Sequence, residues 1–363
     1  MANTQEYGLM DLLSLGLLNP NQPAAAADSG LLQSGIIYDA AQHNADINAL
    51  LGTFTQDFTD YQIEVQQSGG GRSQPIDEFG RALPVKPTVP YTVGLPIQGS
   101  GSALGLTYLT RNRITVRDLA RSYAKLYRGD YRWVVDHVLG QLFASASYTY
   151  RDITGKGNLT IQPLANGDAV TYYRTTSGST SVDTHQLAQA AAIADASNPF
   201  PTIRDELLEH PDNDGEVVAF ISTSLVATTT ALAEFNSATI DPDITLGTDT
   251  DRLTGSLNMT LPLGAVVKGK TDSGVWIVEW PQVPAGYIVA ITTGGARPLG
   301  RRIFPEANLQ GFRSAGERED FPYFEDQWQR WEGYGAYNRT GAVVMRIGNA
   351  SYAVPTNLDV PMP

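Results

Sequence analysis

The segment 115–150 constrains this chain most, because its pattern predicts one long amphipathic helix that runs directly into a strand. Thr115 and Asp118 stand at capping-box spacing, and the acid falls in the first turn, where it favours a helix start. Apolar residues then recur mostly at three- and four-residue steps, with basic residues between them. A helix of about thirty residues spans about 45 Å. The core helix of an ordinary enzyme has the same pattern, so the flanking segments decide the interpretation.

Glycines mark the weak points of this predicted helix. Gly129 and Gly140 both lie in its interior. Each interior glycine lowers helix stability by about 1 kcal/mol relative to alanine. We therefore predict that any bend lies at Gly129.

Composition sets the broad class of the protein. A chain of 363 residues suffices for two or three packed units, or for one domain with large extensions. The net charge of −13 argues against a general nucleic-acid-binding protein. Charged residues make up only 17% of the chain, whereas about a quarter is typical of soluble domains. The low fraction indicates that much of the surface is covered by something other than water. The chain has no cysteine, which excludes disulfides, thiolate metal sites and cysteine nucleophiles.

Neither secretion nor membrane insertion is predicted. The first residues have no positively charged region, and an acid interrupts their short apolar run. The uncharged stretch 217–233 has 17 residues, six of them Ser or Thr, and is therefore short and polar for a membrane span. We predict a buried strand there, followed by a helix near 225–235.

The stretches before the long helix do not resemble a compact domain. Residues 1–59 show one short helical pattern near 39–51, and we expect this arm to pack against something, such as another subunit. Within 60–113, a strand pattern, YQIEVQQ, is followed by glycine and proline clusters. A projecting hairpin and a disordered linker both fit such a long irregular segment.

After the long helix, the sequence predicts a mixture of strands and short helices. One helix is expected over 185–196, with Asp183 as its cap, and another over 201–210, with Thr202 and Asp205 at capping-box spacing. Strands are expected near 145–152, 158–164, 169–176, 217–222, 264–270, 275–281, 286–293, 342–348 and 351–354. No internal repeat is present.

This order of elements resembles that of the tailed-phage major capsid proteins, whose HK-ninety-seven-type fold is shared with encapsulin shells. The resemblance covers nearly the whole chain and depends on organisation more than on a tight motif. Its most specific parts are the long helix that enters a strand at 147–150, the run TIRDELLEHPDNDGEVVAFISTSLVATTTALAEF, and the ending YGAYNRTGAVVMRIGNASYAV, in which a subunit-facing aromatic residue and Arg339 precede a strand.

The resemblance implies an α+β phage capsid fold with five regions. These are an N-terminal arm (1–59), an extended loop (60–113), a peripheral domain with a spine helix (114–182), an axial domain (183–310), and a return to the peripheral domain with the C-terminus (311–363). The resemblance also implies a structural, non-enzymatic subunit that self-assembles as hexamers and pentamers into an icosahedral shell around double-stranded DNA. An encapsulin-type protein compartment is the alternative.

The resemblance further implies partners, a location and shell mechanics. The short arm implies a separate scaffolding protein or prior cleavage, and a portal and a decoration protein are further expected partners, with no membrane. Assembly in the host cytoplasm would place the chain in the virion capsid. Some family members cross-link their shells through a Lys–Asn isopeptide bond, for which Lys86 and either Asn349 or Asn357 are the candidates. Fitting both hexamers and pentamers requires hinges, which we expect at Gly129 and at 69–71.

The sequence predicts no catalytic, cofactor-binding or metal-binding residue. No two histidines lie at metal-ligand spacing on one helix face, so structural or solvated roles are expected for His43, His137, His185 and His210. A solvated acidic loop is favoured over a cation site for Asp241, Asp243, Asp249 and Asp251. A turn before a buried strand is favoured over a calcium site for Asp212, Asn213, Asp214 and Gly215.

One enzyme alternative depends on a cluster of acidic and aromatic residues. Its members are Glu317, Glu319, Asp320, Phe321, Tyr323, Phe324, Trp328 and Trp331. Paired carboxylates among stacked aromatic rings suit glycoside hydrolysis. An aromatic interface between subunits explains the same residues and is the favoured interpretation.

Overall fold

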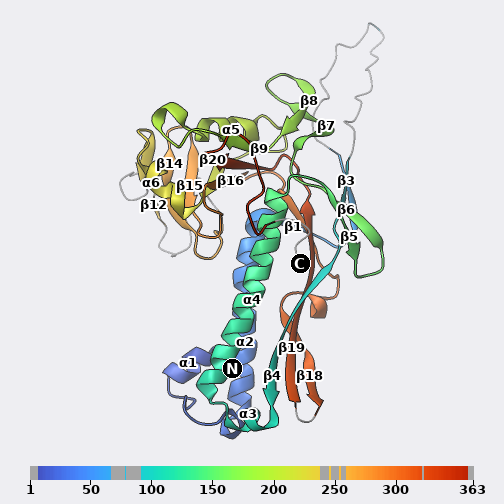
Figure 1. The fold of residues 1–363 in the computed structure, drawn as a ribbon, viewed down its shortest axis with the longest axis vertical. Helices are drawn as coiled ribbons and strands as arrows, with labels where there is room; N and C mark the ends of the chain where they lie inside the picture. Colours follow the sequence, from blue (N-terminus) through green and yellow to red (C-terminus); the bar gives the residue numbers. More distant parts are fainter. Residues whose placement is uncertain are drawn as a thin grey trace. The chain divides into compact units, whose positions relative to one another are not determined.

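The computed structural model describes residues 7–66, 78, 91–237, 245–246, 253–254, 259–320 and 323–358. Figure 1 labels the helices and strands of the chain. The chain forms two compact units, each built from three separate stretches of sequence. Unit 1 comprises Met1–Ala49, Gln98–Val135 and Ile303–Glu332, and unit 2 comprises Leu50–Ile97, Asp136–Arg302 and Gly333–Pro363. Three elements contribute residues to both units: α2 (Ser29–Phe54), α4 (Val116–Phe143) and β19 (Tyr323–Ala336). The five predicted regions remain a prediction.

Unit 1 is built around helices α2 and α4 and three antiparallel strands. Strand β19 pairs with β4 on one side and with β18 on the other. Its remaining elements are α1 (Leu9–Ser14), η1 (Ala24–Ala26), β4 (Gln98–Thr107), α3 (Tyr108–Arg113), η4 (Ala307–Leu309) and β18 (Arg313–Asp320). The core contains Leu9, Leu12, Leu18, Leu32, Ala40, Val116, Ala120, Tyr123, Phe312 and Trp328.

The predicted long helix is confirmed as α4, which has 28 residues. Its start is capped as the sequence indicates, because the Asp118 amide donates to Thr115 Oγ1 at 3.2 Å and that hydroxyl donates to Asp118 Oδ2 at 2.8 Å. The helix continues through Gly129, and the chain enters strand β5 (Tyr148–Asp152) shortly after the helix ends. The apolar stripe of α4 therefore predicted a real core-facing surface.

The arm contains far more helix than the sequence predicted. The short helix expected near 39–51 is part of the 26-residue α2, which begins at Ser29. Asp28 caps this start, since its Oδ1 accepts from the amides of Gly30 at 2.8 Å and Leu31 at 3.1 Å. Leu9, at 1% exposure, is buried within unit 1, so the arm packs on its own chain.

Unit 2 contains a mixed seven-stranded sheet in the order β11-β14-β15-β10-β16-β20-β9. The sheet consists of β9 (Gln186–Gln189), β10 (Val217–Ile221), β11 (Phe235–Ser237), β14 (Val266–Thr271), β15 (Val275–Glu279), β16 (Tyr287–Thr292) and β20 (Ala342–Ile347). Strand β10 is buried at every position, between parallel β15 and antiparallel β16, as expected for its continuous apolar run. Helix α5 (Phe200–Leu208) packs on this sheet through Phe200, Ile203 and Leu207.

The other elements of unit 2 are hairpins, short strands and short helices. Strand β1 pairs with β17, which pairs with β19 in its 333–336 part. The hairpins are β2–β3, β5–β6, β7–β8 and β12–β13. These strands and short helices are β1 (Thr55–Phe58), β2 (Gln62–Val65), β3 (Tyr91–Gly94), β6 (Gly157–Ile161), β7 (Asn166–Arg174), β8 (Ser179–Thr184), η2 (Asp195–Ser197), η3 (Thr223–Leu225), α6 (Val226–Thr230), β12 (Thr245–Leu246), β13 (Leu253–Thr254) and β17 (Leu299–Arg302).

Three local predictions in unit 2 were wrong. The helix expected over 185–196 is strand β9 followed by irregular chain, because Gln186–Gln189 pairs in parallel with β20. Helix α5 has no capping box, and the Phe200 amide instead donates to Asn198 Oδ1 at 3.1 Å. The strand expected at 351–354 is irregular chain. The Tyr352 hydroxyl anchors this chain by donating to the Phe143 carbonyl at 2.8 Å.

The predicted extended loop, 60–113, contains strands and a short helix among its described residues. Its first strand is confirmed as β2, which forms a hairpin with β3. The last part is regular structure, β4 and α3, because the small residues of β4 pair along their whole length with β19. The stretch between β2 and β3 lies outside the described residues except for position 78.

Candidate functional site

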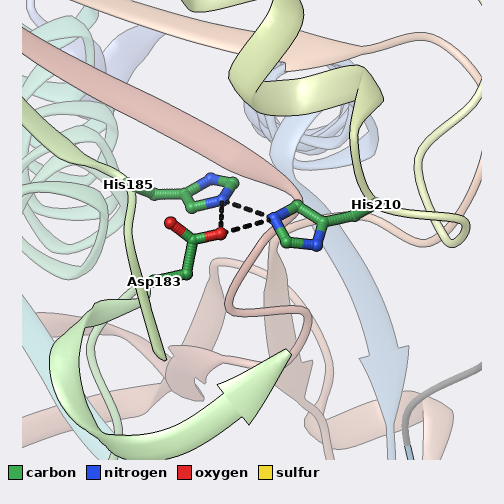
Figure 2. A group of neighbouring side chains, drawn as sticks. All are labelled: Asp183, His185 and His210. Carbon is green, nitrogen blue, oxygen red and sulfur yellow. Dashed lines mark hydrogen bonds and ion pairs between the residues drawn. The ribbon is translucent and has the colours of Figure 1, made fainter. Parts of the chain in front are cut away.

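Unit 2 holds a buried cluster of two histidines and an aspartate, which we call the His–Asp cluster: Asp183, His185 and His210. Asp183 lies near the end of β8, His185 follows between β8 and β9, and His210 follows α5. Their exposed fractions are 4%, 0% and 2%. Figure 2 shows the three side chains pointing toward one another.

Three potential ligand atoms meet in the cluster. The Nε2 atoms of His185 and His210 lie 3.1 Å apart. Asp183 Oδ2 lies 3.0 Å from His210 Nε2 and 3.9 Å from His185 Nε2. Ligand atoms from three separate positions in the chain therefore surround one small volume (Figure 2).

Backbone carbonyls orient both imidazole rings. His185 Nδ1 lies 2.9 Å from the Ala342 carbonyl oxygen, and His210 Nδ1 lies 3.0 Å from the Tyr173 carbonyl oxygen. A carbonyl oxygen only accepts hydrogen bonds, so each Nδ1 carries the proton. When a ring is neutral, its Nε2 therefore presents a lone pair to the centre of the cluster.

An ion pair orients the aspartate. Arg174 Nη2 donates to Asp183 Oδ1 at 2.7 Å, and the Thr184 amide donates to the same oxygen at 2.7 Å. Oδ1 is thus occupied, while Oδ2 faces the histidines. Arg174 Nε also lies 3.2 Å from Glu209 Oε1, so this arginine connects two carboxylates.

Burial and neighbouring charges shift the pKa values in this region. Burial lowers the pKa of His185 to about 3, so the ring is neutral near pH 7. Burial alone would raise the pKa of Asp183, but the hydrogen bond with His210 and other interactions more than offset this and hold the pKa well below its usual range. Burial, together with the nearby Asp183 carboxylate, raises the pKa of Glu206 to about 8.

This cluster was not predicted from the sequence, because His185 and His210 are 25 positions apart. The alanine-rich run 185–196 favours a helix, whereas the extended conformation of this stretch is what brings Asp183 and His185 together. Positions i and i+2 of an extended chain lie on the same face, so the pattern Asp183-x-His185 at a strand end already places two ligand types together.

The other histidines lie apart from the cluster. His43 is buried in unit 1, with its Nε2 2.8 Å from Asp130 Oδ2. His137 is buried in unit 2 and packs near the Tyr334 ring, with ring centroids 6.3 Å apart. Both positions agree with the structural roles expected from the sequence.

The two acidic segments have different outcomes. Asp241, Asp243, Asp249 and Asp251 all lie outside the described residues. The segment 212–215 is the predicted turn before β10. The side-chain Nδ2 of Asn213 donates to the carbonyls of Leu207 at 2.9 Å and Thr340 at 2.7 Å, which gives this residue a structural role.

The acidic–aromatic cluster falls on the β18–β19 hairpin. The structure describes the backbone, but not the side chains, of Glu317, Glu319, Asp320, Tyr323 and Phe324, and Phe321 lies outside the described residues. Trp328 is 4% exposed and donates from Nε1 to Asp326 Oδ2 at 2.8 Å. A ring buried in this way cannot form an open platform for a sugar, so the glycosidase interpretation loses one of its aromatic residues.

The predicted cross-link stays a prediction. Lys86 lies outside the described residues. Asn349 and Asn357 are both exposed in the C-terminal segment, and Asn357 adopts a positive φ of 76°. Among the described residues, no helix combines the length and apolar character that a membrane span requires.

Comparisons with solved structures identify the fold. A chain from Mycobacterium phage Patience superimposes with a TM-score of 0.66 at 21% identity, covering 96% of each chain. The mature capsid asymmetric unit of bacteriophage PhiM1 gives a TM-score of 0.48 at 10% identity, covering 82% of this chain and 87% of that one. The SrpI encapsulin of Synechococcus elongatus gives 0.41 at 10% identity, covering 84% and 89%.

The likeness to the phage Patience chain confirms the predicted fold. The chain has the mixed α and β architecture of the phage capsid fold over nearly its whole length. No protein-family model and no curated protein matches the sequence.

Proposed function

We propose that this chain is a major capsid subunit that self-assembles as hexamers and pentamers into an icosahedral shell around double-stranded DNA. The observation that carries the proposal is the shared fold with a chain of Mycobacterium phage Patience over 96% of both chains. In this proposal the chain is a structural protein of the virion capsid and has no catalytic role.

Exposed apolar side chains support an assembling subunit. Met10, Leu15 and Leu17, beside or within α1, are 60%, 55% and 52% exposed, and Ile37 on α2 is 61% exposed. Scattered apolar residues are normal on any surface, but here they accompany a charged fraction of only 17%. Depletion of charge and enrichment of apolar groups are what the centre of a protein interface requires.

The proposal includes partners and a location. In this proposal the 60–113 segment includes the loop that overlaps a neighbouring subunit, and a separate scaffolding protein, a portal and a decoration protein complete assembly in the host cytoplasm. The net charge of −13 would limit adhesion to the enclosed polyanion. The Lys86 cross-link to Asn349 or Asn357 belongs to the same proposal.

Negative-stain electron microscopy, with light scattering on the same sample, tests the proposal. We expect closed shells, or rings of five and six subunits, from the full chain alone or with a co-expressed scaffolding protein. Closure without a scaffold around a protein cargo would instead favour the encapsulin-type compartment. A monodisperse monomer under both conditions would refute both.

A pair of variants on one helix sharpens the test. Ile37→Glu places a charge on an exposed apolar residue of α2, and we expect it to reduce assembly without unfolding the subunit. Asn48→Asp adds the same charge at an exposed polar position of α2 and should assemble like the parent. Equal assembly by the two variants would show that Ile37 lies outside every subunit contact.

A further inference from the structure

The His–Asp cluster brings together three atoms with lone pairs that repel one another unless a proton or a metal ion lies between them. Both imidazole Nδ1 atoms face backbone carbonyls, so both Nε2 lone pairs point inward, toward each other and toward Asp183 Oδ2. A buried polar atom without a donor or cation is destabilising. Asp183 Oδ2 is buried, and its 3.0 Å contact with His210 Nε2 is favourable only if a proton or a metal ion lies between the two atoms.

The distances between these atoms match a metal's coordination shell. Zinc binds imidazole nitrogen and carboxylate oxygen at about 2.0–2.2 Å, so two ligand atoms of a tetrahedral site lie about 3.3 Å apart. The three distances in the cluster are 3.0, 3.1 and 3.9 Å and bracket that value. A bound ion would bring the 3.9 Å distance between Asp183 Oδ2 and His185 Nε2 closer to that value.

The surroundings have the features of a metal site's outer shell. Metal-binding histidines commonly donate their other ring nitrogen to a carbonyl or carboxylate, as both rings do here. Arg174 and the Thr184 amide hold Asp183 Oδ1 and so direct Oδ2 inward. Glu209 Oε1, 3.8 Å from His210 Nε2, is near enough to supply or support a fourth ligand.

One member of the cluster, His210, lines a cavity. A cavity of about 380 Å³ in unit 2 is lined by His210 together with Tyr172, Tyr173 and Asp212. Its volume exceeds that of a hydrated ion. The aspartate contributes negative charge, and Arg174 and Glu209 offset each other beside it.

We propose that Asp183, His185 and His210 form a binding site for one divalent transition-metal ion, with Zn²⁺ as the ion that best matches two imidazoles and a carboxylate. The bound ion would fasten the β8–β9 junction to the chain that follows α5. This inference goes beyond the proposed capsid function, and it can be tested on the dispersed subunit whether or not shells form.

Calorimetric titration of Zn²⁺ into chelator-treated full-length protein tests the site. We expect one ion per chain and an increase in melting temperature on binding. Co²⁺ in the same site should give the strong visible absorption of a four-coordinate ion. A parent protein that binds no Zn²⁺ would overturn the proposal and would indicate that the cluster shares a proton instead.

Two ligand variants and one matched control locate the ion. His210→Gln removes a ligand nitrogen, and Asp183→Asn keeps an acceptor for Arg174 while removing the carboxylate charge. Since even supporting residues around a metal contribute 10–100-fold, we expect each ligand variant to weaken Zn²⁺ binding at least about 100-fold. His43→Gln changes another buried histidine beside a carboxylate and should leave Zn²⁺ binding unchanged.

Circular dichroism of each variant separates lost binding from lost folding. Folded ligand variants that bind Zn²⁺ as tightly as the parent would overturn the assignment. So would a His43→Gln variant that loses binding to the same extent as they do. If one ligand variant fails to fold, the other still decides the question.

Discussion

Arg330 offers the sharpest test of how unit 1 is held together. Its side chain is 1% exposed and lies between two buried carboxylates. Nη2 donates to Asp130 Oδ2 at 2.8 Å, Nε lies 3.0 Å from both Asp130 oxygens, and Nη1 donates to Glu332 Oε1 at 2.7 Å. Nη2 also donates to Asn44 Oδ1 at 3.0 Å. One guanidinium thus joins α2, α4 and β19.

Replacing Arg330 with methionine should be strongly destabilising. The substitution roughly conserves side-chain length but removes the guanidinium that contacts Asp130 and Glu332, whose side chains are 0% and 2% exposed. Removing one partner of a buried ion pair costs about 3–5 kcal/mol, because the remaining charge stays desolvated. Total stabilities are about 5–15 kcal/mol, so the loss is a large fraction of the whole.

Guanidinium unfolding of the dispersed subunit, followed by tryptophan fluorescence, measures this loss. Trp328 is 4% exposed in the core of unit 1 and reports on its unfolding. With a slope of about 4 kcal/mol per molar denaturant, a loss of 4 kcal/mol moves the midpoint down by about 1 M. Amide hydrogen exchange along β19 should increase in parallel.

The control is another arginine in the same unit. Arg121 on α4 has a 65% exposed side chain and lies 3.5 Å from Asp118. Exposed pairs contribute little, so Arg121→Met should cost less than about 1 kcal/mol. If Arg330→Met costs no more than this control, the ion-pair network does not stabilise unit 1 and the reasoning fails.

Three further predictions use the same unfolding assay. Arg339→Lys should lower the free energy of unfolding by about 2–3 kcal/mol. Arg339 is fully buried, and its planar guanidinium donates to Pro163 O at 2.8 Å and to Asn166 Oδ1 at 3.0 Å. A loss below about 0.5 kcal/mol would contradict this prediction. Burial alone would raise the pKa of Asp152, but its hydrogen bonds and the Arg302 guanidinium lower it. Ionised Asp152 therefore adds to the free energy of unfolding above its unfolded pKa of about 4, and this stabilisation is lost as pH falls through the folded pKa. The stability of Asp152→Asn should therefore fall less steeply than that of the parent below about pH 4. Equal slopes of stability against pH for the two proteins would contradict this prediction. Gly129→Ala should stabilise α4 by up to about 1 kcal/mol, since an added Cβ there meets nothing within 4 Å, and if Gly129 is a hinge the yield of closed shells should fall in electron micrographs.

The sequence predicted correctly those helices and strands whose spacing of apolar residues matches the surfaces that are buried in the fold. Helix α4 has both a capping residue at Thr115 and a continuous apolar stripe. Strand β10 is a continuous apolar run because neighbouring strands and α5 cover it. In both elements, local propensity and burial favour the same structure.

Helix α2 was underestimated because glycines interrupt its pattern. Gly35 lies in its interior, where a helix-breaking residue is expected. A Cβ at Gly35 would lie 3.0 Å from the side chains of Leu9 and Leu12, so the glycine permits a close approach of α1. The Asp28 cap was the usable signal for the true start of the helix.

The region after β8 could not be predicted from local propensity. The alanine-rich run after His185 favours a helix when it is considered alone. Pairing of Gln186–Gln189 with β20 outweighs that preference. The histidine partners depend on this same long-range pairing, which is why the candidate site was missed together with the strand.

The interleaving of unit 1 has a consequence for how the protein is made. Asn44 and Phe312 exchange two hydrogen bonds although they are 268 positions apart, and the third stretch of unit 1 ends at Glu332. A ribosome adds about 5–20 residues per second, so roughly 15–65 s pass between synthesis of the arm and synthesis of β19, which completes the core of unit 1. During that time Leu9, Leu12 and the apolar side of α2 lack their final partners. We expect the nascent arm to bind chaperones, and only the nearly finished chain to be competent for assembly.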